Sequence, residues 1–234
     1  MKWVLIIDPS KNEREYLQRI VGRLGYRLFA AENGRQGLYY ARQSLPDAVI
    51  IGEGVMDYTP TELCRIFKED PSLSTAPILH VSSSGDRTCR TEAFEAGFAG
   101  VVQRPLSVRH FFQDLERCLS STRKDIRVPV SIPVRILRGL EQFSLWSFNI
   151  GEGGVYLKTM SPLPPQTGLG VQFKLPGLRK LFDFKGRVIH SIKSDSEELP
   201  AGMGVMFTDI SETIRTILSL YMEYHLTSAE LPAR

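Results

Sequence analysis

The pattern of apolar residues changes about halfway along the chain, and this change constrains the fold more than any other feature of the sequence. In the first half, short runs rich in branched residues alternate with stretches at helical spacing. The runs lie at residues 4–7, 28–30, 49–51, 78–81 and 101–102. Strands that alternate with helices predict a parallel sheet covered on both faces. We therefore expect a doubly wound, five-stranded α/β domain over residues 1–120.

Two helices of this domain have clear sequence signals. Ser10 followed by Glu13 has the spacing of a capping box, in which each residue's side chain binds the other's backbone N–H, and Gly25 is a typical stop. A second apolar stripe at helical spacing lies further along the chain. It consists of Val108, Phe111, Phe112, Leu115 and Leu119.

The second half contains strand-like runs that Gly and Pro turns separate, with no helical stretch between them. They lie at residues 128–137, 145–150, 154–158, 171–175, 182–192 and 204–207. Regular short strands of this kind predict a small antiparallel β-barrel. Ser211 then caps a terminal helix. We assign residues 121–234 to this second, all-β domain.

Composition excludes several classes of protein. Apolar residues make up 42% of the chain and charged residues 24%, which is ordinary for a globular protein. The net charge of +3 is too small for a nucleic-acid-binding face. The apolar run at residues 3–7 is too short for a membrane span or a signal peptide. Three cysteines without CxxC spacing indicate reduced thiols, so we expect a cytoplasmic protein.

Signatures of catalysis and metal binding are absent from the sequence. It contains no Walker A string, HExxH motif or GxSxG motif. The four histidines share no metal-ligand spacing with the cysteines. We therefore expect neither an enzyme nor a metal site.

The first domain carries residues 4–8, 46–51 and 76–82 in the pattern of a response-regulator receiver domain, together with the Arg104-Pro105 pair, and it resembles that family. In receivers, an aspartate that ends the third strand accepts phosphate. An acidic pair after the first strand helps to hold Mg²⁺, and a lysine contacts the phosphate. Here Gly52 occupies the acceptor position, and Pro9 leaves Asp8 as the only member of the acidic pair. The resemblance therefore implies a degenerate receiver without phosphate or Mg²⁺ chemistry.

Of two further positions of the receiver pattern, one is changed and one is kept. Arg104 replaces the lysine, whereas Ser82 keeps the hydroxyl group. Glu53 neighbours the acceptor position, but alternation along a strand end points it elsewhere, so we expect a solvated side chain. Asp8 is interpreted as a polar residue that closes a strand and leads into the Ser10 cap.

By analogy with receivers that pair through their last helices, this domain is expected to serve homodimerisation or docking of a protein partner.

The chemistry of the second domain centres on two strings. Arg123 and Arg127 are four residues apart, and guanidinium groups bind planar anionic groups by bidentate hydrogen bonds. A glycine-rich turn follows at residues 149–154, where Asn149 can pair with a guanine edge and Gly154 is expected to adopt a left-handed conformation. With the flanking barrel pattern, the two strings resemble the RxxxR and [D/N]xSxxG motifs of the PilZ domain.

This resemblance implies binding of the bacterial second messenger cyclic di-GMP at Arg123, Lys124, Arg127, Asn149, Gly151 and Gly154. Gly151 stands where the family has serine. Losing that hydroxyl removes one hydrogen bond, worth about 0.5–1.5 kcal/mol, or roughly three- to tenfold in affinity. The leading hypothesis is a receptor in which ligand at the interdomain linker changes domain arrangement and partner binding. The alternative is an interaction scaffold that has lost both phosphorylation and cyclic di-GMP binding.

Overall fold

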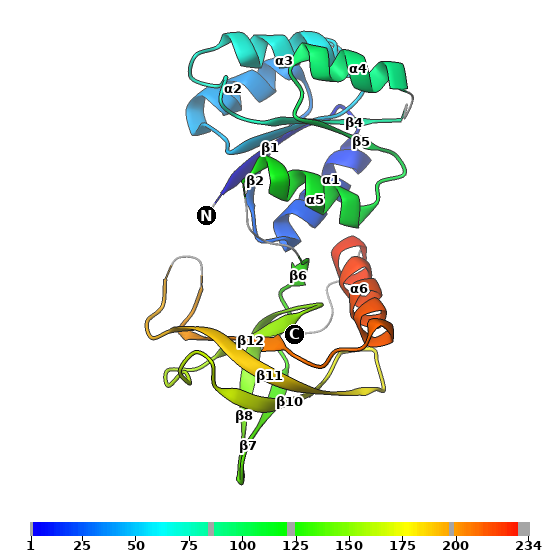
Figure 1. Ribbon diagram of the computed structural model, residues 1–234. Coiled ribbons are helices and arrows are strands. Elements are labelled where there is room, and N and C mark those ends of the chain that lie inside the picture. Colours follow the sequence, from blue (N-terminus) through cyan, green and yellow to red (C-terminus); the bar gives the residue numbers. More distant parts are fainter. Residues whose placement is uncertain (1, 84–86, 121–124, 197–198, 229–234) are drawn as a thin grey trace. The chain divides into compact units, whose positions relative to one another are not determined.

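The computed structural model describes residues 2–83, 87–120, 125–196 and 199–228, and the chain divides into two compact units (Figure 1). The first unit comprises Met1–Lys124 and the second Asp125–Arg234. Among the described helices, none combines the length and the apolar character that crossing a lipid bilayer requires.

The first unit is a parallel sheet with the strand order β2-β1-β3-β4-β5. Its strands are β1 (Trp3–Ile7), β2 (Arg27–Ala31), β3 (Ala48–Ile51), β4 (Ile78–Ser82) and β5 (Gly100–Gln103). Its helices are α1 (Lys11–Arg23), α2 (Gly34–Ser44), α3 (Pro60–Glu69), α4 (Arg87–Ala96) and α5 (Val108–Cys118). Helices α1 and α5 cover one face of the sheet and α2, α3 and α4 cover the other (Figure 1). The predicted doubly wound domain is confirmed.

The start of α1 differs in detail from the prediction. The Ser10 hydroxyl accepts a hydrogen bond from the backbone N–H of Glu13 at 3.4 Å, so Ser10 is the N-cap. The reciprocal half of the capping box is not formed, because the backbone N–H of Ser10 donates to Asp8 Oδ1 at 2.9 Å instead. At the other end, Gly25 follows the C-cap residue with a φ of +88°, as a stop signal requires.

The apolar stripe of α5 belongs to the core of the first unit. Val108, Phe111, Phe112 and Leu115 are each at most 6% exposed, and Leu119 just beyond the helix is 3% exposed. The helix buries this stripe against its own sheet, which is the ordinary fate of an amphipathic face. These side chains are therefore not available for a contact with another chain. The outward face of α5 carries His110, Gln113 and Arg117 instead.

The second unit is an antiparallel barrel. Its strands are β6 (Arg127–Val128), β7 (Pro133–Arg138), β8 (Glu141–Gly151), β9 (Gly154–Lys158), β10 (Gly168–Lys174), β11 (Leu181–Ile192) and β12 (Gly202–Phe207). The order is β6-β8-β7-β10-β11-β12-β9, and β9 also pairs with β8, which closes the barrel and leaves β6 as a short addition to β8. The terminal helix α6 (Glu212–Thr227) begins after Ser211, whose hydroxyl accepts from the backbone N–H of Ile214. The predicted barrel and helix are confirmed.

Alternation along the strands fills the barrel with aromatic rings. Phe182 and Phe184 of β11 point inward, and Phe184 stacks on Phe207 with ring centroids 4.3 Å apart. Phe173 of β10 stacks on Phe182 at 5.4 Å. Offset aromatic pairs of this kind add stability beyond their buried area. This core holds β11 and β12 in the register on which the nearby pocket depends.

Candidate functional site

The space around Gly52, at the carboxyl end of β3, is occupied by a neighbouring side chain. A Cβ atom built on Gly52 would lie 1.9 Å from Asp8 Oδ2 and 2.6 Å from Asp8 Cγ. The backbone N–H of Gly52 donates to the carbonyl oxygen of Ile7 at 2.8 Å, which fixes the two strand ends side by side. The Asp8 carboxylate therefore lies where an acceptor side chain at position 52 would begin.

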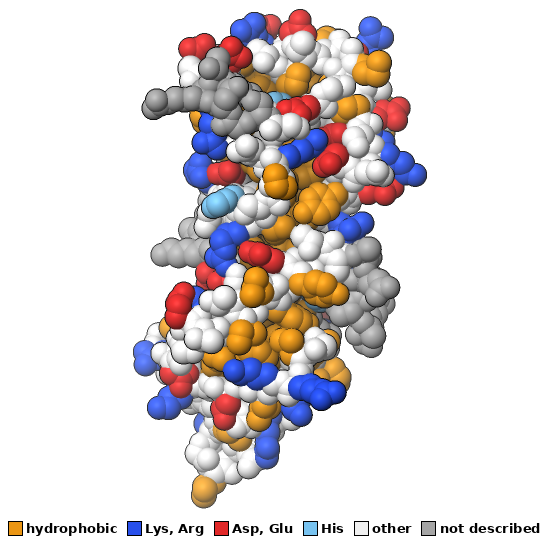
Figure 2. All heavy atoms as spheres, turned by 90° about the vertical axis from the view of Figure 1, so that its right-hand side faces the viewer, with side chains coloured by type: hydrophobic (Ala, Val, Ile, Leu, Met, Phe, Trp, Pro, Cys, Tyr) orange, Lys and Arg blue, Asp and Glu red, His pale blue; other side chains and the backbone are white. Residues whose placement is uncertain are grey.

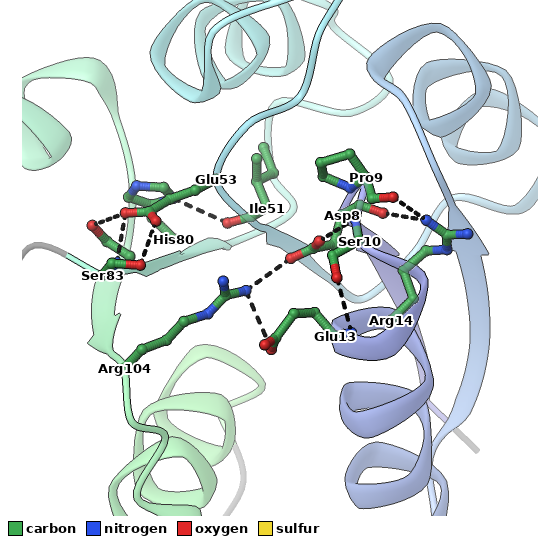
Figure 3. A network of polar contacts seen from close by, with 11 residues as sticks. Asp8, Pro9, Ser10, Glu13, Arg14, Ile51, Glu53, His80, Ser83 and Arg104 are labelled. Atoms are coloured by element: carbon green, nitrogen blue, oxygen red, sulfur yellow. Dashed lines mark hydrogen bonds and ion pairs between the residues drawn. The ribbon is translucent and has the colours of Figure 1, made fainter.

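Asp8 is the buried member of an ion-pair network (Figure 3). It is 1% exposed, and its Oδ2 accepts a hydrogen bond from Arg104 Nη2 at 3.0 Å. The same nitrogen lies 3.4 Å from Glu13 Oε2. Burial raises the pKa of Asp8, while the N–H of Ser10 and the Arg104 guanidinium oppose this rise. Asp8 is thus more than a polar strand end, because its charge is already balanced from within the protein.

Arginine side chains approach the oxygen atoms of both residues 8 and 9. Arg104 Nη2 lies 3.0 Å from Asp8 Oδ2, and the carbonyl oxygen of Pro9 accepts from Arg14 Nη1 at 2.9 Å. Within the described residues, no group of three or more His, Cys, Asp or Glu side chains is placed to hold a metal ion.

Glu53 is engaged with the end of β4, so its interpretation as a merely solvated residue was wrong (Figure 3). Its Oε1 accepts from Ser82 Oγ at 2.6 Å and from the backbone N–H of Ser83 at 2.5 Å, and its Oε2 accepts from Ser83 Oγ at 2.7 Å. Burial alone would raise the pKa of Glu53, but these hydrogen bonds outweigh it and lower the pKa to about 2. The hydroxyl group of Ser82 is therefore already hydrogen-bonded to a carboxylate of the same domain, that of Glu53.

In the second unit, the predicted ligand residues come together at one pocket of about 270 Å³. It is lined by Asp125, Arg127, Asn149, Gly151, Gly153, Gly154, Val155, Tyr156, Ile189, His190, Gly204, Val205, Met206, Phe207 and Arg215. These residues come from β6, β8, β9, β11, β12, α6 and the connections beside them. Arg127, Asn149, Gly151 and Gly154 are thus neighbours in space. Arg123 and Lys124 lie outside the described residues.

Register explains why glycine occurs at position 151. Gly151 pairs with Arg127 across β8 and β6, and a Cβ atom at position 151 would lie 2.9 Å from the carbonyl oxygen of Ile126 and 3.0 Å from Arg127 Cγ. The φ of Gly151 is not in the left-handed region. The glycine therefore permits close approach of the strand that carries Arg127.

Gly154 has a similar role, and the prediction of a left-handed conformation there was wrong. Its φ lies outside the left-handed region, but a Cβ atom would lie 2.4 Å from the carbonyl oxygen of Val205. Residue 154 pairs with Met206 at the start of the β9–β12 ladder. Glycine is needed because β12 passes too close for any side chain.

Asn149 presents an unsatisfied acceptor in this region. Its Oδ1 is buried and has no hydrogen-bond partner among the described residues. The residue follows an irregularity in the β8–β9 pairing between Ser147 and Asn149. A buried acceptor without a partner is unfavourable, and a ligand N–H group would relieve it.

An aromatic pair forms another wall, which the sequence analysis missed. Tyr156 of β9 is 2% exposed and donates its hydroxyl to the carbonyl oxygen of Pro200 at 2.7 Å. The His190 ring stacks on Tyr156 with centroids 5.7 Å apart, and it lies over Gly204, where a Cβ atom would be 2.3 Å from His190 Cε1. Burial and, to a lesser degree, the charge of Arg127 lower the pKa of His190, which favours the neutral form of the ring.

A signal for His190 did exist in the sequence. Phe182, Phe184 and Val188 alternate along β11 as inward-facing residues, and continuing this period of two reaches position 190. Arg215 had no comparable signal, because its position beside the pocket depends on how α6 packs against β6 and β8.

Comparisons with family models agree with both architectures. The model of the response regulator receiver domain matches residues 4–116, and the PilZ domain model matches residues 121–224. Among curated proteins, the chain is similar to Histidine kinase P4 of Formosa agariphila, with 29% identity over 108 residues that make up 46% of this chain and 8% of the kinase. It is also similar to "Probable transcriptional regulator ycf27" of Guillardia theta, with 26% identity over 121 residues, or 52% of this chain and 46% of that protein.

Among solved structures, the chain resembles the chemotaxis response regulator CheY4 of Vibrio cholerae. The identity is 22%, the TM-score is 0.48, and the match covers 50% of this chain and 98% of CheY4. The two curated relatives named above extend well beyond the matched region, since the chain spans less than half of the length of each. The chain thus consists of a response-regulator receiver domain followed by a PilZ domain.

Proposed function

We propose that this chain is a non-enzymatic cyclic di-GMP receptor, in which the ligand binds the pocket of the PilZ domain. The combination of a receiver domain and a PilZ domain is that of a signalling protein. The observation that carries the proposal is the convergence of Arg127 with the unsatisfied Oδ1 of Asn149 at one pocket. Guanidinium suits a phosphate or the O6/N7 edge of guanine, and an amide acceptor suits guanine N–H groups.

The chemistry of Asn149 suits guanine. The Watson–Crick edge of guanine presents adjacent N–H donors at N1 and N2, and either can donate to the buried acceptor Asn149 Oδ1. Adenine also has a donor on that edge, its N6 amino group, so this acceptor alone does not set the choice of base.

The receiver domain is proposed to take no phosphate. Position 52 has no carboxylate, the space beside it is filled by Asp8, and Glu53 is held by Ser82 and Ser83. We propose instead that the domain supplies contacts to a second copy of the chain or to a protein partner. Because Arg127 is only two residues from the division between the units at Asp125, ligand binding there is proposed to change the arrangement of the units and hence partner binding.

Partner contacts would need accessible surface on both units. Figure 2 shows Lys and Arg interspersed with Asp and Glu on the visible face, which gives no single-sign patch of the kind that nucleic acids bind. The same view shows hydrophobic side chains gathered on its lower half. On α6, Leu220 is 62% exposed and Tyr224 is 70% exposed. Exposed apolar side chains support docking of a protein rather than of nucleic acid.

Titration calorimetry of the full chain with cyclic di-GMP tests the proposal. We expect micromolar binding by the wild-type protein and a loss of about tenfold or more in Arg127→Ala, since a charge-assisted hydrogen bond contributes about 1.5–3 kcal/mol. Arg187→Ala is the matched control, because Arg187 is an exposed residue of β11 that does not line the pocket. Absence of binding by the wild type at millimolar ligand would favour the interaction scaffold.

A further inference from the structure

The pocket has a second arginine that neither PilZ motif includes. Arg215 lies in the first turns of α6, is half-buried, and lines the pocket together with Arg127. The two side chains come from different elements, because Arg127 belongs to β6 and Arg215 to the terminal helix. Helix α6 packs against β6 and β8, and its residue Arg215 lines the same pocket as Arg127.

The guanidinium group of Arg215 has no partner inside the described part of the protein. No hydrogen bond or ion pair involves its side chain there, whereas Arg104, which is also partly buried, binds Asp8 and Glu13. Taking a cation partly out of water without a counter-charge is unfavourable. A half-buried guanidinium that faces a pocket is therefore suited to an anion that arrives with the ligand.

The other charged and titratable groups of the pocket are consistent with this role. Asp125 is the acidic residue of the lining, and its Oδ2 lies 3.0 Å from the Cβ position of Gly153, at the turn. Burial lowers the pKa of His190, which disfavours a positive charge on its ring. The positive charges that can meet a ligand phosphate from the described lining are thus those of Arg127 and Arg215.

We propose that Arg215 binds a phosphate group of the cyclic dinucleotide, so that the ligand links β6 to the terminal helix. This inference rests on the proposed function and adds to it a binding residue and a mechanical consequence. A cyclic dinucleotide carries two phosphates, so a second guanidinium has a group of its own to bind. Because Arg215 is fixed to α6, an occupied pocket holds the beginning of that helix against β6.

The test compares four proteins by calorimetry with cyclic di-GMP: wild type, Arg215→Gln, Arg215→Lys and Arg187→Gln. We expect Arg215→Gln to bind about tenfold or more weakly, since it loses charge-assisted hydrogen bonds to phosphate. The affinity of Arg215→Lys should lie between those of the wild type and Arg215→Gln, because lysine keeps the charge but not the bidentate geometry. Arg187→Gln should match the wild type, since Arg187 is a surface residue outside the pocket.

Two further readouts separate ligand binding from a structural role. The ligand-free melting temperature of Arg215→Gln should equal that of the wild type, because the side chain forms no hydrogen bond within the described part of the chain. Cyclic di-GMP should slow amide exchange in the first turns of α6 in the wild type and not in Arg215→Gln.

Equal affinity of Arg215→Gln and wild type would overturn the inference and leave the receptor function intact. A loss shared by Arg187→Gln, or a loss accompanied by a lower ligand-free melting temperature, would overturn it as well. No binding by the wild type would instead refute the receptor function itself.

Discussion

The carboxylate of Asp8 lies where a side chain on Gly52 would begin, with Oδ2 only 1.9 Å from the Cβ position. A side chain introduced at position 52 would therefore meet the Asp8 carboxylate. That carboxylate is paired with Arg104, whose Nη2 lies 3.0 Å from Asp8 Oδ2. We therefore expect that an aspartate restored at position 52 alone does not recreate a phosphorylation site.

We expect neither the wild type nor Gly52→Asp to take up phosphate from acetyl phosphate or to bind beryllofluoride with Mg²⁺. In Gly52→Asp the new side chain must displace Asp8 and adds a second carboxylate beside it. Overpacking of this kind costs about 1–3 kcal/mol, so the variant should melt at a lower temperature. Intact mass and melting curves check both points. A stable adduct that maps to Asp8 or Glu53 would contradict the degenerate receiver.

Glu53→Gln should destabilise the receiver domain at pH 7 by about 1–3 kcal/mol, because three hydrogen bonds to a charged acceptor are weakened. The folded state lowers the pKa of Glu53 to about 2 from an ordinary 4.5. The carboxylate therefore stabilises the fold above pH 4.5, and this contribution is lost as the pH falls toward 2. Denaturant unfolding should show that the difference in free energy of unfolding between wild type and Glu53→Gln becomes smaller over that pH range. A difference that does not change with pH, or an equal loss of stability in the exposed control Glu69→Gln, would contradict this role of the Glu53 carboxylate.

A homodimer, where one forms, is expected to use the outward face of α5. The predicted apolar stripe of this helix is buried in the domain core, so the available residues are polar, namely His110, Gln113 and Arg117. They line a depression of about 520 Å³ that also includes residues of α4 and β5. Arg117→Glu should shift full-length protein toward monomer in sedimentation velocity, whereas Arg187→Glu on the barrel should not. A dimer that survives the first change and dissociates with the second would place the interface elsewhere.

Patterns along the chain predicted the fold of both domains because each strand and helix carries its own periodic signal. The stripe of α5 and the alternation of β11 are such signals. Contacts between segments that are distant along the chain were harder to predict from the sequence. The ion pair between Asp8 and Arg104 joins residues that are 96 positions apart, and the engagement of Glu53 depends on the end of a neighbouring strand. Neither leaves a local trace in the sequence.

The glycines of the pocket illustrate the same limit. The sequence pattern predicted a left-handed turn at Gly154, but its φ lies outside the left-handed region and the carbonyl oxygen of Val205 lies only 2.4 Å from the Cβ position. The reason for the glycine lies in β12, which is some fifty residues away along the chain. A motif indicates that a residue type matters, whereas packing decides why.

Gly154→Ala should therefore lower the stability of the PilZ domain by about 1–3 kcal/mol through overpacking. Gly168→Ala is a matched control, because Gly168 also lies in a strand, has no left-handed φ, and has no atom within 4 Å of its Cβ position. Thermal unfolding of the two variants compares them directly. Equal melting temperatures would show that β9 and β12 can separate without cost.

The serine that PilZ motifs carry at position 151 is expected to have two opposing effects in this chain. Its Cβ atom would lie 2.9 Å from the backbone oxygen of Ile126 and 3.0 Å from Arg127 Cγ, so β6 would have to shift together with Arg127. Its hydroxyl would add one hydrogen bond, worth about three- to tenfold in affinity. Since the first atom in the way belongs to the backbone, we expect the steric cost to exceed this gain.

Calorimetry of Gly151→Ala and Gly151→Ser with cyclic di-GMP separates the two effects. Alanine adds the Cβ atom alone, so it should bind more weakly than wild type. Serine should bind about three- to tenfold more tightly than alanine and still more weakly than wild type. Tighter binding by Gly151→Ser than by the wild type would show that β6 yields easily and that the hydroxyl dominates. Indistinguishable affinities of the alanine and serine variants would show instead that the hydroxyl at this position does not reach the ligand.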